Sequence, residues 1–124
     1  MSIIDGMMGV TLELTEEQMG EIIQDYLLPG EAVEKGYQIV RDLILFTDRR
    51  MIIINHAGFT GKKIEYQMIP YKNINRYVIE TPGNMDTDYT IKLFLTGSIE
   101  PLEKQFRKTI NILELNRLLG SHIL

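Results

Sequence analysis

The feature that most constrains the fold is a change of hydrophobic period in the middle of the chain. From residue 31 to 106, β-branched and aromatic residues occur in short runs that turn-forming residues separate. In "KIEYQMI", Ile64, Tyr66 and Met68 alternate with polar residues, as expected for a strand half buried in an antiparallel sheet. We count seven such runs, near 31–41, 42–47, 51–55, 63–69, 73–80, 89–95 and 99–106. The central part of the chain is therefore predicted to be an antiparallel sheet of about seven strands.

A helix is predicted before the strands. In "LTEEQMGEIIQDYLLPGE", Thr15 and Gln18 have the spacing of a capping box, and Pro29-Gly30 ends the segment. The apolar residues between them recur at helical spacing and form one stripe, which has to cover an apolar surface. These signals predict a docked helix over about 15–27.

A second helix is predicted after residue 106, in "TINILELNRLLGSHIL". Asn111 and Glu114 have capping spacing at its start, and Gly120 is the expected C-cap. A small antiparallel sheet curls until its edges approach, and a helix at one open end buries its own apolar stripe.

These parts predict one domain over 1–124. It comprises an N-terminal segment with a helix (1–30), a β-barrel (31–106) and a C-terminal capping helix (107–124). The expected fold class is mainly β (α+β), a split barrel of about seven antiparallel strands with an extra N-terminal helix.

The amino-acid composition argues against several classes of function for this protein. The chain has no cysteine, so disulfides, thiolate metal sites and cysteine nucleophiles are excluded. Its formal net charge of −4 argues against nucleic-acid binding, which needs a basic surface. The start has no signal-peptide pattern and no apolar run has the length of a membrane span, so we expect a cytoplasmic protein.

The charges are unevenly distributed. Residues 1–48 contain two basic residues against ten acidic ones, a charge of −8. Residues 49–76 contain six basic residues against Glu65, a charge of +5. A chain divided in this way can pair the acidic surface of one copy with the basic surface of the next.

No catalytic, cofactor or metal site is expected. His56 and His122 are the only histidines, and neither has a triad or metal-ligand pattern around it. Asp86 and Asp88 fall short of the oxygen ligands that calcium takes, so we interpret them as a polar turn. An enzyme without a recognisable motif is kept only as a third hypothesis.

Several local strings together resemble the bacterial pleckstrin-homology-like (PH-like) domain family. They are "DGMMG", "RDLILFTDRR", "GFTGKKIEY", "IPYKNI", "IETPGNMDTD" and "EKQF" running on to "NIL", and the resemblance extends over nearly the whole chain. It implies a split barrel capped by the C-terminal helix, no catalytic activity and a tendency to assemble into ring-like homo-oligomers.

The resemblance also bears on Arg49-Arg50, which the fold would place at the second hairpin. Lipid-binding eukaryotic relatives gather basic residues at the first hairpin, where this chain has only Arg41 beside Asp42. We interpret Arg49-Arg50 as a solvated turn, with a phosphate site and a protein interface as the alternatives. Lys62-Lys63, after a glycine-containing loop, are interpreted as solubilising hairpin residues, with anion binding as the alternative.

The sequence thus favours a non-enzymatic interaction module that binds copies of itself and an unidentified protein partner. The alternative is a peripheral module that binds anionic lipid through the basic segment 49–76, which the acidic segment opposes, so a membrane partner is not expected. The candidate interface comprises Met7, Met8, Glu16, Glu17, Glu21, Arg49, Arg50, Phe59, Lys62 and Lys63. Paired strand edges are the competing way in which copies could join.

Overall fold

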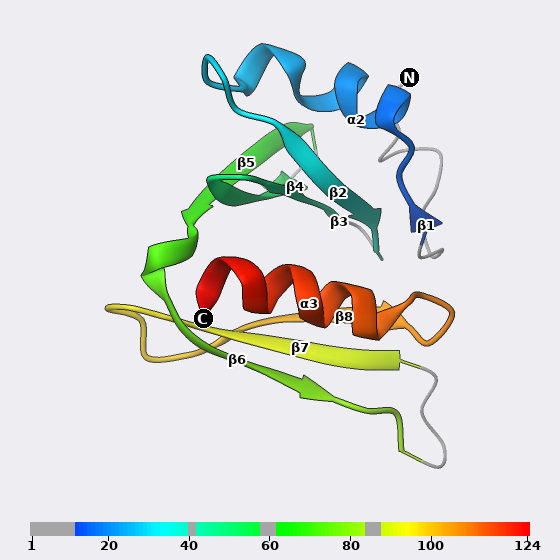
Figure 1. Cartoon of the computed structure of the whole chain (residues 1–124), viewed down its shortest axis with the longest axis vertical. Coiled ribbons are helices and arrows are strands. Elements are labelled where there is room, and N and C mark those ends of the chain that lie inside the picture. Colours follow the sequence, from blue (N-terminus) through cyan, green and yellow to red (C-terminus); the bar gives the residue numbers. More distant parts are fainter. Residues whose placement is uncertain (1–11, 40–41, 58–61, 84–87) are drawn as a thin grey trace. The chain divides into compact units, whose positions relative to one another are not determined.

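The computed structural model describes residues 12–39, 42–57, 62–83 and 88–124, and these form two compact units that divide at residues 69 and 70. Figure 1 shows their elements. The first unit contains β1 (Leu12–Glu13), α2 (Glu16–Ile23), the 3-10 turn η1 (Gln24–Tyr26), β2 (Val33–Gln38), β3 (Asp42–Thr47), β4 (Arg50–Ala57) and β5 (Lys63–Pro70). The second contains η2 (Tyr71–Asn73), β6 (Ile74–Glu80), β7 (Asp88–Leu95), β8 (Leu102–Arg107) and α3 (Ile112–Ile123).

The first unit is a five-stranded sheet with strand order β1-β2-β3-β4-β5. Strand β3 pairs antiparallel with both β2 and β4, and a register shift marks a bulge between Val33 and Lys35. All seven predicted runs appear as strands, and β1, a two-residue strand, was not predicted.

Helix α2 packs on one face of this sheet through the stripe that the sequence predicted. The buried cluster consists of Leu14, Met19, Ile23, Leu43, Leu45, Ile52 and Ile54. Burying each such side chain contributes about 1.5–3 kcal/mol. The backbone of Gly36 makes the close approach possible, because a Cβ there would lie 2.7 Å from the Met19 sulfur.

The predicted start of the N-terminal helix is confirmed, but the α-helix ends earlier than the predicted residue 27. Thr15 and Gln18 form both hydrogen bonds of the capping box. The α-helix ends at Ile23, and a 3-10 turn continues to Tyr26.

The second unit is a three-stranded sheet of order β6-β7-β8, against which α3 packs. Asn111 caps α3 as predicted, its side chain accepting a hydrogen bond from the N–H of Glu114. The expectation that Gly120 is the C-cap was wrong, because the helix runs on to Ile123. Gly120 instead lies opposite β6, where an added Cβ would be 3.2 Å from the Tyr77 hydroxyl.

Candidate functional site

A buried ion pair joins the start of β4 to the loop that precedes β2. The Arg50 Nε donates to Glu31 Oε2 at 2.9 Å, and its Nη2 donates to Glu31 Oε1 at 2.9 Å. The same Nη2 donates to the carbonyl of Tyr26 at 2.9 Å. The side chain of Glu31 is 0% exposed and that of Arg50 is 15% exposed. The two-bond geometry is the strong, charge-assisted form of this pair.

Two further donors complete the environment of the Glu31 carboxylate. The Thr47 hydroxyl donates to Oε2 at 2.6 Å, and the N–H of Leu28 donates to Oε1 at 2.9 Å. Burial alone would raise the pKa of Glu31, but the hydrogen bonds from Arg50, Leu28 and Thr47 and the charge of Arg50 lower it to about 2. The carboxylate is therefore charged and has its hydrogen bonds satisfied inside the protein.

The interpretation of Arg49-Arg50 as a solvated turn was wrong for Arg50, which pairs with Glu31 inside the first unit. Arg49 does lie exposed in the turn, and its Nη2 donates to the carbonyl of Pro29 at 3.1 Å. Both arginines thus hold the turn at 29–31 against the β3–β4 hairpin. Gly30 adopts a φ of 81° in that turn, a conformation that glycine tolerates without strain.

The acidic candidates lie together on α2. Glu16, Glu17 and Glu21 are all exposed, and the first two lie in the first turn of the helix, where negative charge is favourable. The opposite, core-facing side of α2 carries Met19 and Ile23. The helix thus presents a carboxylate surface.

The basic candidates Lys62 and Lys63 lie at the start of β5, at the other edge of the sheet, and both are exposed. Next to them, Ile64 is 40% exposed. On the same face as Ile64, the ring of Tyr66 stacks on that of Tyr26 with centroids 4.1 Å apart. Burial first, and then the hydrogen bond with Tyr26, raise the pKa of Tyr66 above its ordinary value.

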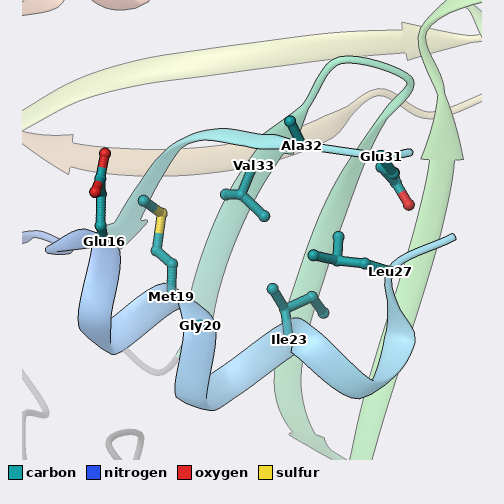
Figure 2. Close-up of a pocket in the computed structure, with 8 residues that line it drawn as sticks. All are labelled: Glu16, Met19, Gly20, Ile23, Leu27, Glu31, Ala32 and Val33. Atoms are coloured by element: carbon teal, nitrogen blue, oxygen red, sulfur yellow. The ribbon is translucent and has the colours of Figure 1, made fainter. Parts of the chain in front are cut away.

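A pocket of about 270 Å³ lies between α2 and the beginning of β2 (Figure 2). It is lined by Glu16, Met19, Gly20, Ile23, Leu27, Glu31, Ala32 and Val33. Most of these residues are apolar, and Glu31 is already committed to Arg50. The pocket is therefore a largely apolar hollow. The exposed Glu16 is one of its lining residues.

The remaining polar candidates form no site in the described parts. His122 stacks in parallel on Tyr71, with ring centroids 4.3 Å apart, and Asp88 pairs with Arg107 at 3.6 Å. Across the described ranges, no group of three or more histidine, aspartate or glutamate side chains could hold a metal ion. No helix there is long and apolar enough to cross a bilayer.

Four candidates lie outside the description. Met7, Met8, Phe59 and Asp86 belong to ranges that the structure does not describe, as does the side chain of His56. Of the candidate interface, the structure describes Glu16, Glu17, Glu21, Arg49, Arg50, Lys62 and Lys63.

Sequence reasoning missed Glu31 and Thr47, the partners of Arg50. A signal for them existed in the strand register. The predicted runs 31–41 and 42–47 adjoin, so antiparallel pairing between them would place residues near 32 opposite residues near 48, and the structure pairs Val33 with Thr47.

A family comparison decides the assignment. The family model described as bacterial PH domain matches residues 2–123. The chain belongs to this family. As a bacterial PH domain it is similar to two proteins of Bacillus subtilis strain 168. The uncharacterized protein YjqA is 41% identical over 122 residues, 98% of both chains, and the uncharacterized protein YozO is 32% identical over 101 residues, 82% of this chain and 86% of that one.

Solved structures agree with this bacterial PH domain assignment. A DUF1696 family protein with a pleckstrin-homology domain from Shewanella loihica PV-4 aligns with a TM-score of 0.83 and 29% identity, covering 94% of this chain and 99% of that one. A pleckstrin homology domain from Shewanella amazonensis SB2B aligns with a TM-score of 0.74 and 32% identity, covering 90% of each. The predicted family and the mainly-β PH-like fold with a C-terminal helix are confirmed.

Proposed function

We propose that this bacterial PH domain is a non-enzymatic interaction module that associates with copies of itself, head to tail. PH-like folds are typically non-catalytic modules, which supports the absence of an enzymatic role. The observation that carries self-association is the placement of opposite charges. Exposed glutamates lie on α2, whereas exposed lysines lie at the far edge strand β5 of the same sheet.

Head-to-tail contact follows from this separation. Each copy offers one acidic and one basic surface, and the two surfaces differ, so a contact between them is heterologous. Heterologous contacts close into a ring when the rotation between copies allows it, and otherwise they propagate as a filament. A ring-like homo-oligomer is the closed form of this arrangement.

Size-exclusion chromatography with light scattering tests the proposal. We expect the full chain at low salt to have a mass several times that of one copy, 14.3 kDa. A mass of one copy at the highest soluble concentration would overturn self-association.

Binding to anionic lipid through segment 49–76 has less support. Of the six basic residues there, Arg50 is paired with Glu31, Arg49 binds the Pro29 carbonyl and Arg76 lies over the ring of Phe94 at 3.9 Å. Arg50 is therefore largely unavailable to a phosphate surface, and the exposed Arg49 and Arg76 already have partners within the chain. The acidic α2 in the same unit adds repulsion from such a surface.

A further inference from the structure

The pocket beside α2 has the chemistry to receive an apolar side chain with a positive charge next to it. Met19, Ile23 and Leu27 give it apolar walls (Figure 2). Glu31, at one end, is neutralised by Arg50 and offers no free charge. Glu16 lines the pocket and is exposed, so its carboxylate faces any charged group that arrives with the occupant.

The floor of the pocket is open at Gly20. A Cβ built on this residue would have no atom within 4 Å. Glycine in a helix interior costs about 0.5–1 kcal/mol relative to alanine. Gly20 therefore leaves this part of the pocket lining without a side chain, at some cost in helix stability.

A matching group lies on the same molecule, at the start of β5. Ile64 is 40% exposed, although it is β-branched and apolar. Lys62 and Lys63 immediately precede Ile64 in the chain, and both are exposed. An apolar side chain flanked by ammonium groups complements an apolar hollow flanked by a carboxylate.

The two groups do not form one site within a single copy. Ile64 is not among the residues that line the pocket. The pocket lies beside β2, whereas Ile64 lies on β5, with β3 and β4 between them in the sheet. A second copy therefore offers an occupant whose apolar side chain and charge complement the pocket.

We propose that Ile64 of one copy inserts into the α2–β2 pocket of a second copy, with Lys62 and Lys63 against Glu16 of that second copy. This inference rests on the self-association proposed above and names its contact surfaces. The contact is heterologous, so an open assembly keeps one unused pocket at one end and one unused Ile64 at the other until it closes.

Two variants test the contact: one blocks the pocket and the other removes the inserted side chain. Gly20→Leu fills the pocket, and it should stabilise α2 because leucine is the better helix former. Ile64→Thr removes the apolar insert and keeps a β-branched residue on the strand. Leu113→Gln is the matched control, since Leu113 is 64% exposed on α3 and has no part in the contact.

The first experiment measures the mass of each variant alone by light scattering. We expect G20L and I64T each to fall to the mass of one copy, whereas L113Q keeps the wild-type mass. Thermal unfolding verifies that G20L is at least as stable as wild type, so its loss of assembly is not a loss of folding.

The second experiment measures the mass of a mixture of the two variants, and it tests the pairing of Ile64 with the pocket directly. A G20L copy retains Ile64 and an I64T copy retains an open pocket, so the mixture can form one contact and no more. We expect a 1:1 dimer that does not grow. If wild type assembles but G20L keeps its mass, or the mixture gives no dimer, the proposed contact is wrong while self-association stands. If wild type is itself a single copy, self-association fails and this contact fails with it.

Discussion

The Arg50 guanidinium and the Glu31 carboxylate, 19 positions apart in the sequence, form two hydrogen bonds of 2.9 Å inside the first unit. The pair fixes the chain that leaves α2 to the hairpin of β3 and β4. It thereby holds one wall of the α2–β2 pocket, since Glu31 is one of the lining residues. The stability of this pair and the geometry of the proposed contact surface are therefore linked.

Replacing Arg50 should be strongly destabilising. Arg50→Met leaves the carboxylate of Glu31 buried without its charged partner, and breaking a buried pair in this way costs about 3–5 kcal/mol. Urea unfolding measures the loss. Arg49→Met is the matched control, because Arg49 is exposed and should cost no more than about 1 kcal/mol. Equal losses for the two variants would contradict the assigned role of Arg50.

Acid should weaken the same pair. The pKa of Glu31 is about 2 in the folded protein against an ordinary value of 4.5, so the carboxylate stabilises the fold above pH 4.5. This contribution, on the order of 3 kcal/mol at about 1.4 kcal/mol per pH unit, is lost as the pH falls from 4.5 toward 2. The free energy of unfolding of wild type should approach that of Glu31→Gln over this range. A constant difference between them would show that Glu31 does not titrate as described.

Two glycines in the first unit should respond to alanine in opposite directions. Gly36→Ala places a methyl 2.7 Å from the Met19 sulfur and 3.2 Å from Leu14 Cδ1, so the buried side chains of Met19 and Leu14 have to shift. We expect a loss of about 1–3 kcal/mol. Gly20→Ala meets no atom and should gain about 0.5–1 kcal/mol. Chemical denaturation of both variants measures the difference, and a neutral G36A would contradict the close packing of α2.

Anionic lipid should not recruit the protein. Arg50 is committed to Glu31, the exposed Arg49 and Arg76 already have partners within the chain, and the exposed acids of α2 oppose binding. In liposome sedimentation, the bound fraction should not rise as phosphatidylserine increases to about a third of the bilayer. A steady rise that Lys62→Glu with Lys63→Glu abolishes would favour the lipid-binding alternative.

The strands and helix starts were predictable from sequence because their signals are local. Alternation in "KIEYQMI" and the capping box at Thr15 involve residues a few positions apart. The helix ends were less predictable. Gly120 has the residue type of a C-cap, but packing opposite Tyr77 keeps it inside α3.

The site was predictable only in part, because its decisive contacts join distant segments. Exposed acids on α2 and exposed lysines near β5 follow from pattern and charge. The burial of Arg50 depends on the register between β2 and β3, and the pocket depends on how α2 lies on the sheet. Neither can be read from a local string.

The central claim, that opposite charges on α2 and at the start of β5 join the copies, is tested most directly by light scattering across an ionic-strength series. The Debye length falls from about 10 Å at 0.1 M salt to about 3 Å at 1 M, which screens exposed charge pairs. We predict that the mass of the assembly falls toward one copy over this range. Lys62→Glu with Lys63→Glu should abolish assembly at low salt, and adding Glu16→Lys with Glu17→Lys should restore it. An assembly whose mass changes neither with salt nor with the lysine reversal would contradict the claim and favour paired strand edges.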